Sequence, residues 1–536
     1  MNIPLNLFSW LLAVLPIVTL LYLMVTRRWG ATKAAPVGFI IASVTGFLYF
    51  ESGFTLWGVE VLKGLWSTFA VILVVWPAIL LYEVVNEANA FTVFRQGLQK
   101  ITPNELLQVI TLGWVFTSFL QGITGFGVPV AVGAPLLVGL GVHPIWAVLI
   151  PLIGHAWANT FGTLAVAWDA LVLQTNLASD PALLLSTALW AAVFIWVWNI
   201  ITGIAISWIY GGKVGLKKGL PAVLIISLIH GGGQLLLTQV NQTLAAFIPA
   251  TIALVAVFLI SKTPWYNKPW SIADSKVMDR SRVQTNERVD SSMTMIQAFV
   301  PYFTLTFVTL FVLLINPIRS TLAQWRIGFA FPETATGLGY INPASALFSP
   351  ISPFTHASFF LLIASAVGVL YYSKHQWMDQ AGASNALRRS VQKAVPSLLA
   401  VLGFILMSRI MGGTGQTLIL AQGFATTLGN YYVILAPVVG MLGSFMTSSN
   451  MASNILFGEF QLTTATILDL NVAPILGAQT AGGAIGNTIC PGNIILGTTT
   501  AGVLGSEGEV LRKILPLTVV ATVIVGGILF VTQVLL

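Results

Sequence analysis

Long apolar runs separated by short polar stretches make up most of this sequence. A helix that crosses the hydrocarbon core of a membrane needs about 20 mostly apolar residues, and these runs reach or approach that length. The runs are Leu7–Val25, Thr68–Leu81, Leu184–Ile209, Leu220–Leu237, Ala245–Ile260, Phe299–Ile315, Phe359–Tyr372, Pro396–Met411 and Ile514–Leu536. With the shorter, glycine-interrupted runs between them, the pattern predicts an all-α polytopic membrane protein with roughly 12 to 14 transmembrane segments.

Two core stretches, residues 119–159 and 447–487, interrupt this pattern with glycine and polar residues. In the first, three glycines within six residues precede Pro129, and both residue types disfavour a continuous helix. At membrane depth such breaks are tolerated only where protein or a water-filled cavity satisfies the freed backbone groups. Two re-entrant or broken helices, at corresponding positions of two halves, predict a transport site near the midplane of the bilayer.

The two core stretches also share their spacing. Gly122 and Asn159 are 37 positions apart, and so are Asn450 and Asn487. Each stretch ends at an Asn that is followed by Thr, at Asn159–Thr160 and Asn487–Thr488. The shared spacing predicts an internal repeat, although it does not distinguish an inverted repeat from a parallel one.

A polar segment at the middle of the chain divides it into two halves. Residues 1–261 form the predicted N-terminal transmembrane half, with its broken-helix core near 119–163. Residues 262–294 form a predicted polar cytoplasmic linker. Residues 295–536 form the C-terminal transmembrane half, with its core near 445–500.

Charge is scarce and clustered. Only 8% of the residues are charged, 56% are hydrophobic and the mean hydropathy is +0.88, whereas a soluble protein is about 25% charged. The net charge of +7 comes from clusters between apolar runs, which indicates a membrane protein rather than a nucleic-acid binder. The positive-inside rule places these clusters in the cytoplasm and predicts that both termini lie outside. The clusters are Arg27, Arg28 and Lys33; Lys213, Lys217 and Lys218; residues 262–290; residues 374–393; and Arg512 with Lys513.

Motifs of enzymes and of ATP-driven pumps are absent from the sequence. It contains no GxxxxGK[ST] phosphate loop, so direct ATP drive is not expected, and no HExxH, CxxC or GxSxG motif. The five histidines, at 143, 155, 230, 356 and 375, lack the spacing of metal ligands. We therefore expect a transporter rather than an enzyme, with no cofactor or metal.

Neutral polar groups of the two cores are the predicted substrate-binding residues. A helix that restarts after a break presents free N–H groups and a positive dipole end, which suit a carboxylate. The competing interpretation is that the glycines only permit close helix packing and that the polar groups form an interhelical hydrogen-bond network. The predicted set is Gln121, Gly122, Thr124, Gly125, Gly127, His155, Asn159, Thr160, Thr447, Ser448, Ser449, Asn450, Ser453, Asn454, Gln479, Thr480, Asn487 and Thr488.

Three charged residues within apolar runs are further candidates, because intramembrane charges are rare and are functional by default. Arg409 is predicted to pair with an anionic substrate, and its alternatives are a structural ion pair or snorkelling to the interface. Asp169 and Glu459 are the predicted proton-coupling residues, with a helix-end acid near the outer surface as their alternative.

Four motifs resemble those of the L-lactate permease family. They are FLQGITGFGVPVAVGAPLLVGLG from residue 119, SFMTSSNMASNILFGEFQ from 444, GAQTAGGAIGNTICPGNI from 477 and GVLGSEGEVLRKIL from 502. The resemblance covers most of residues 110–175 and 430–515. It implies a secondary transporter that couples the import of lactate, glycolate or a similar 2-hydroxymonocarboxylate to protons, in a prokaryotic inner membrane.

Three positions depart from the pattern of this family. Its best-known members carry Glu at the position of Gln121, Asp at that of Asn450 and Lys at that of Asn487. These departures, with the neutral oxygens of the cores, keep a sodium-coupled transporter and a passive facilitator open as alternatives to proton symport. The sequence also leaves open the exact substrate and the oligomeric state, a homo-oligomer included.

Overall fold

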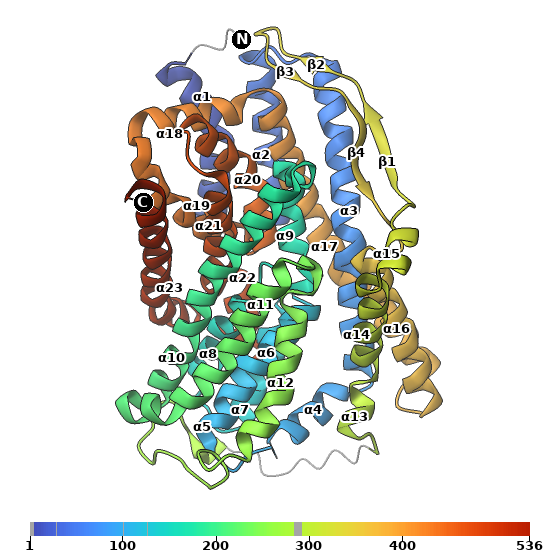
Figure 1. Cartoon of the computed structure of the whole chain (residues 1–536), viewed down its shortest axis with the longest axis vertical. Coiled ribbons are helices and arrows are strands. Elements are labelled where there is room, and N and C mark those ends of the chain that lie inside the picture. The colour runs from blue at the N-terminus through green and yellow to red at the C-terminus, as the bar shows by residue number, and fades with distance from the viewer. Residues whose placement is uncertain (1–4, 28, 100, 126, 283–291, 536) are drawn as a thin grey trace.

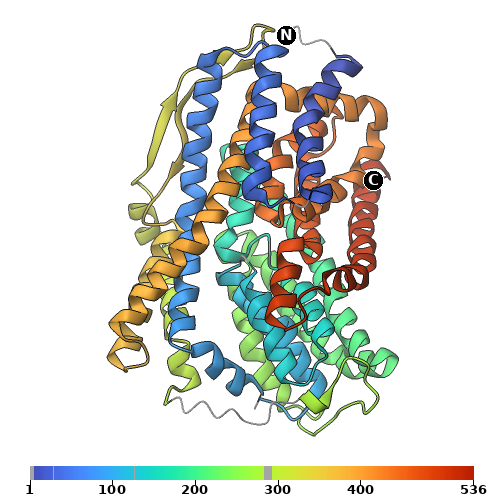
Figure 2. The ribbon, with the colours of Figure 1, turned by 180° about the vertical axis from the view of Figure 1, so that it is seen from behind.

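The computed structural model describes residues 5–27, 29–99, 101–125, 127–282 and 292–535, and it is mostly helical (Figures 1 and 2). The helices of the first half are α1 (Leu7–Leu21), α2 (Ala31–Leu48), α3 (Phe54–Glu87), α4 (Ala90–Gln99), α5 (Glu105–Ile110), α6 (Phe116–Ile123), α7 (Val128–Gly139), α8 (Pro144–Ala156), α9 (Gly162–Thr175), α10 (Pro181–Ser227), α11 (Gly233–Thr238) and α12 (Phe247–Ser261). Those of the second half are α13 (Met295–Ala298), α14 (Val300–Leu314), α15 (Asn316–Leu322), α16 (Ala357–Lys374), α17 (Gln380–Gly413), α18 (Gln416–Leu428), α19 (Tyr432–Thr447), α20 (Asn450–Ile467), α21 (Val472–Gly486), α22 (Pro491–Thr500) and α23 (Glu507–Phe530).

Ten helical stretches of the described chain are long and apolar enough to cross a membrane, or up to eleven if the bent pair α14–α15 forms one span. This is fewer than the 12 to 14 segments expected, for two physical reasons. One stretch, residues 181–238, contains two arms, because the backbone of α10 leaves helical geometry at Gly211 and Gly212. The core helices α7 and α8 have only 12 and 13 residues, about 20 Å of helix against a hydrocarbon core of about 30 Å.

The two core stretches have the same sequence of helices and breaks. In the first half, α6 ends before Gly125 and α7 begins after Gly127, and a second break separates α8 from α9. In the second half, α19 ends before Ser448, and a second break lies between α21 and α22. The structure thus contains broken helices in both core stretches, and each stretch has two breaks rather than one.

Helices of the two halves pack against each other rather than forming separate bodies. Helix α17 runs beside α3, and α21 packs against α10. Polar contacts also cross between the halves, such as the hydrogen bond that Thr45 Oγ1 donates to Gln416 Oε1 at 3.2 Å. The division into two halves therefore describes the order of the chain, and the core is built from both.

A β-hairpin interrupts the second half, and the hydrophobic pattern did not predict it. Strands β1 (Ile327–Phe331) and β4 (Ser345–Ile351) pair antiparallel, as do the shorter β2 (Thr334–Ala335) and β3 (Ile341–Asn342). The hairpin runs along α3 (Figure 1). It forms one wall of a cavity described below.

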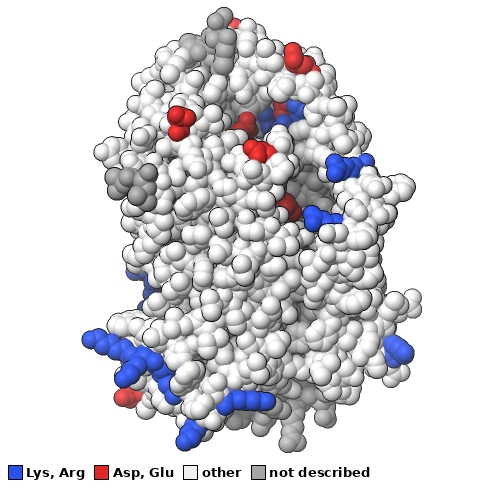
Figure 3. Space-filling model, in the orientation of Figure 1, with Lys and Arg blue, Asp and Glu red and all other residues white. Residues whose placement is uncertain are grey.

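The described part of the central linker, up to residue 282, is docked against the helices. Tyr266 Oη donates to the carbonyl of Lys218 at 2.8 Å, and Arg280 pairs with Glu105 at 2.7 Å. Burial raises the pKa of Tyr266 to about 12. The linker and the bend of α10 lie at the lower end of the molecule, and both termini lie in its upper half (Figure 1). Basic side chains gather at the lower end (Figure 3). Which end faces the cytoplasm stays a prediction, and residues 283–291 lie outside the described chain.

Candidate functional site

A small polar cavity lies where the four helix breaks meet. Its volume is about 70 Å³, and it is enclosed by residues that lie more than 300 positions apart. Eight of the predicted substrate-binding residues line it: Gln121, Gly127, His155, Asn159, Ser448, Ser449, Asn450 and Asn487. The remaining wall is formed by Gly162, Thr163, Val166, Ala167, Met451 and Asn493.

Three regular helices begin at this cavity, and α9 begins there at Gly162 with a left-handed turn. Gly127 precedes α7, Ser449 caps α20 by accepting from Ala452 N at 3.3 Å, and Asn493 lies in the first turn of α22. The start of a helix carries partial positive charge from the helix dipole. At α7 this charge acts without free N–H groups, because Val128 N donates to the carbonyl of Gly125 at 2.9 Å and the next residue is a proline. The helix dipoles favour an anion, although no Lys, Arg, Asp or Glu of the described chain lines this cavity.

The break between α6 and α7 requires glycine. Gly125 and Gly127 have φ of +55° and +81°, in the left-handed region where side chains are strained. A Cβ added at Gly125 would lie 2.2 Å from Thr163 Oγ1, so a side chain at this position would require Thr163 to move.

The start of α9 is strained. Thr163, Leu164 and Ala165 have φ of 50°, 52° and 70°, three successive non-glycine residues in a left-handed turn. Each such residue costs about 1–2 kcal/mol. Strain of this kind persists only where the surroundings fix it, and it is concentrated at functional sites.

Hydrogen bonds between the two core stretches hold the cavity together. Gln121 Nε2 donates to Asn159 Oδ1 at 2.9 Å within the first core. Asn450 Nδ2 donates to Thr160 Oγ1 at 3.2 Å across the two cores. Asn454 Nδ2 donates to Thr480 Oγ1 at 2.9 Å and to the carbonyl of Ala167 at 2.8 Å.

Other predicted residues form a second layer behind this wall. Gln479 Nε2 donates to Ser453 Oγ at 3.2 Å, and Gln479 Oε1 accepts from Gln461 Nε2 at 2.9 Å. Thr160 and Thr480 join through their hydroxyls at 3.2 Å. These groups form the interhelical hydrogen-bond network that was the competing interpretation. They support the cavity but do not line it.

Four predicted residues have local roles away from the cavity wall. A Cβ at Gly122 would meet the backbone of Phe247 at 3.0 Å, so this glycine serves close packing with α12. Thr124, Thr447 and Thr488 donate to carbonyls three or four residues earlier in the chain. These three hydroxyls cap or bend their own helices.

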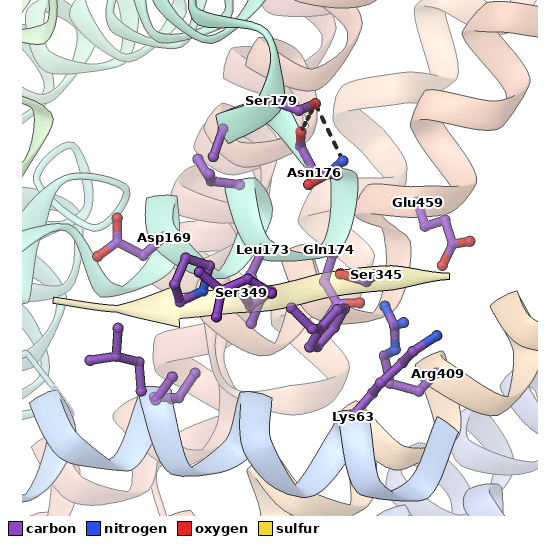
Figure 4. A pocket seen from close by; sticks show the side chains of 18 of the residues that line it. Lys63, Asp169, Leu173, Gln174, Asn176, Ser179, Ser345, Ser349, Arg409 and Glu459 are labelled. Atoms are coloured by element: carbon purple, nitrogen blue, oxygen red, sulfur yellow. Dashed lines mark hydrogen bonds between the residues drawn. The ribbon is translucent and has the colours of Figure 1, made fainter. Parts of the chain in front are cut away.

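The predicted charged residues lie in a second, larger cavity. Arg409, Asp169 and Glu459 all line this cavity of about 930 Å³, between α3, α9, α17, α20 and strand β4 (Figure 4). Acidic and basic side chains lie within hollows of the upper half of the surface (Figure 3). Val166 lines both cavities, so the two are neighbours.

Arg409 has a protein partner. Its Nη2 lies 3.0 Å from Glu60 Oε2, and Lys63 Nζ lies 2.7 Å from Glu60 Oε1. The guanidinium also lies over the ring of Phe348 from β4, 5.1 Å from its centroid. The alternative of a structural ion pair is therefore present in the structure, and Arg409 is not in the small cavity.

The sequence argument missed Glu60 and Lys63. Both are almost fully buried, with 1% and 4% exposure. They lie within α3, a span of membrane length, and intramembrane charge is the signal that would have found them. The rule was applied to Arg409, Asp169 and Glu459 but not to this helix.

Membrane-length helices surround paired broken helices whose ends face a polar cavity, and this arrangement defines a polytopic membrane transporter. The chain belongs to the L-lactate permease family, since the family model described as L-lactate permease matches residues 9–536. It is thus a multi-pass membrane permease rather than an enzyme.

Curated relatives match the chain over almost its whole length. An L-lactate permease of Halalkalibacterium halodurans is 26% identical over 518 residues, covering 95% of this chain and 93% of the relative. The glycolate permease GlcA of Escherichia coli is 25% identical, covering 94% of this chain and 92% of the relative. The YdaH transporter of Alcanivorax borkumensis, a solved structure, gives a TM-score of 0.41 at 15% identity, covering 87% of this chain and 85% of that one.

Proposed function

We propose that this protein is a secondary-active importer of L-lactate, glycolate or a similar small 2-hydroxymonocarboxylate, driven by proton symport across a bacterial cell membrane. The observation that carries the proposal is the small cavity at the meeting point of the four helix breaks. The names of the relatives, which are lactate and glycolate permeases, agree with it.

The size of the cavity suits such a substrate. Its volume of about 70 Å³ is small, and it is far smaller than the neighbouring cavity of about 930 Å³. A small monocarboxylate therefore suits it better than a larger dicarboxylate.

The chemistry of the wall suits a carboxylate that carries a hydroxyl group. The three helix N-termini at the cavity attract the carboxylate. Amides and hydroxyls supply the hydrogen bonds, and Asn159 Nδ2 has no partner among the described residues, which leaves a donor available. The substrate-binding set comprises the wall residues, with Thr160, Ser453, Asn454, Gln479 and Thr480 supporting them.

The larger cavity serves as the vestibule. Lys63 and Arg409 attract the anion, and Val166 lies between the vestibule and the small cavity. Asp169 and Glu459 are the vestibule carboxylates that would deliver the coupling proton. Intramembrane acids in other transporters commonly relay protons.

Sodium is the competing coupling ion. Half-helix C-termini and neutral oxygens suit Na⁺, and α6, α8 and α21 end at the small cavity with Gln121, His155 and Asn487 in its wall. A passive facilitator is the remaining alternative.

Reconstituted protein tests these proposals. Proteoliposomes are offered radiolabelled lactate, glycolate, pyruvate and succinate, with pH and sodium gradients imposed separately. We expect lactate and glycolate to accumulate when a pH gradient alone is imposed. Accumulation that requires a sodium gradient would show that sodium, not the proton, is the coupling ion. Counterflow without accumulation would indicate a facilitator. If neither lactate nor glycolate moved, the proposed substrate would be overturned.

A further inference from the structure

One ionisable side chain, that of His155, is present among the described residues that line the small cavity. Gln121, Asn450 and Asn487, the three positions where the family resemblance implies ionisable residues, all lie in its wall and are neutral. Of the described residues that line the cavity, only His155 has a side chain that can bind a proton and become charged. The imidazole is 1% exposed and belongs to the last turn of α8.

The hydrogen bonding of the ring defines which nitrogen exchanges protons. His155 Nδ1 lies 2.6 Å from the carbonyl oxygen of Pro151. A carbonyl oxygen only accepts, so Nδ1 carries a hydrogen. Nε2 is therefore the nitrogen that gains and loses a proton.

We infer that His155 carries the symported proton, with Nε2 protonated when the substrate carboxylate is bound beside it. The inference rests on the proposed function and assigns its coupling step to one atom. A proton from the vestibule bonds to the lone pair of Nε2, and the same N–H bond breaks when the cavity opens to the other side. The proton and the carboxylate leave together.

The physical basis of the coupling is the cost of an unpaired buried charge. An imidazolium alone, or a carboxylate alone, is expensive in a buried site unless it is paired. Together they form a neutral pair, so each favours binding of the other. The C-terminal end of α8 further favours positive charge at His155.

No Lys, Arg, Asp or Glu of the described residues lines the cavity beside the ring. The elements that pack against α8 are α6, α7, α10, α22, α23 and the short turns Thr111–Val115 and Asn487–Ile489. Lys513 of α23 lies over the ring of Trp146, at the opposite end of α8, about 14 Å of helix from His155. His230 stacks on Trp157, and Cys490 donates to the carbonyl of Ser444. The remaining titratable groups on these elements are Glu507, Glu509 and Arg512 at the start of α23 and Tyr210, Lys213, Lys217 and Lys218 near the bend of α10.

Proton uptake on binding tests the inference directly. Purified protein in detergent with a pH indicator, titrated with lactate at a pH above the ordinary range of histidine, should take up about one proton per lactate bound. D169N/E459Q should keep this uptake, because the inference assigns the bound proton to His155. Lactate binding without proton uptake, or loss of the uptake in D169N/E459Q, would overturn the inference.

Variants of His155 test it in proteoliposomes. H155N and H155Q should lose accumulation driven by a pH gradient, while lactate counterflow continues with a KM raised several-fold. The matched control is H143N, since His143 is exposed and lies at the start of the same helix. Its accumulation should equal that of the unmodified protein.

The outcomes distinguish the role of His155 from the proposed transport of lactate. Full pH-driven accumulation by H155N would overturn the role of His155 and leave the proposed function intact. Equal loss of accumulation and counterflow in both variants would also overturn it, because a structural role predicts that result. Failure of the unmodified protein to move lactate in either assay would overturn the proposed function, and the coupling role with it.

Discussion

Asn450 Nδ2 donates a hydrogen bond to Thr160 Oγ1 at 3.2 Å, joining two residues that lie 290 positions apart. Asn450 opens α20, and Thr160 lies in the break between α8 and α9. This bond therefore ties together a broken helix from each half of the chain at the wall of the small cavity.

We expect Asn450→Ala to weaken substrate binding, because it removes this cross-link and a polar group of the cavity wall. One hydrogen bond contributes about 1 kcal/mol, which corresponds to a KM for lactate raised about fivefold. Initial uptake rates in proteoliposomes measure it. Asn430→Ala, at an exposed turn, is the control and should leave the KM unchanged; an unchanged KM in Asn450→Ala would remove this residue from the site.

We expect Arg409→Ala to abolish lactate uptake while the protein still reaches the membrane. Without the guanidinium, the vestibule keeps the carboxylates Glu60, Glu459 and Asp169, and their excess negative charge repels an anion. Uptake in membrane vesicles, normalised to the amount of protein, measures this. Arg319→Ala, an exposed residue of α15, serves as the control. Unchanged uptake in Arg409→Ala would show that its ion pair with Glu60 is structural only.

We expect the double variant D169N/E459Q to slow uptake driven by a pH gradient by about tenfold or more. The reason is that positioned proton-transfer groups typically raise the rate of proton transfer by at least this factor. Its final level of accumulation should not change, because the vestibule carboxylates deliver the proton but do not hold it beside the substrate. A time course of uptake separates the two quantities. A lowered final level would make these acids part of the coupling itself.

We expect Gly125→Ala to abolish transport and to lower the thermal stability. The new Cβ would lie 2.2 Å from Thr163 Oγ1, and the backbone at φ +55° is strained for alanine. Gly58→Ala in α3 is the matched control, because nothing lies within 4 Å of its added Cβ. Alanine favours a helix interior by about 0.5–1 kcal/mol, so the control should be at least as stable as the unmodified protein. The melting temperatures of Gly125→Ala and Gly58→Ala, each compared with that of the unmodified protein, test this expectation.

Much of the small cavity could be predicted from local sequence. Gly125, Gly127 and Pro129 disfavour a continuous helix whatever surrounds them, so the breaks were visible without a structure. The role of Arg409 was not visible in the same way. Whether a membrane arginine meets a substrate or a carboxylate depends on which helix lies opposite, and Glu60 is 349 positions away. The hairpin β1–β4 was missed because its short strands lie outside the long apolar runs on which the segments were predicted.

The sequence by itself determined the class of protein, the places where helices break and the polar character of the residues there. These properties follow from apolar length, from backbone restrictions and from the cost of burying polar groups in hydrocarbon. Only the tertiary structure decided which of those residues share one cavity. It joined Gln121, His155, Asn450 and Asn487 around about 70 Å³ and put Arg409, Asp169 and Glu459 in another cavity. The reason is that proximity between helices is fixed by packing across hundreds of residues, which no local pattern records.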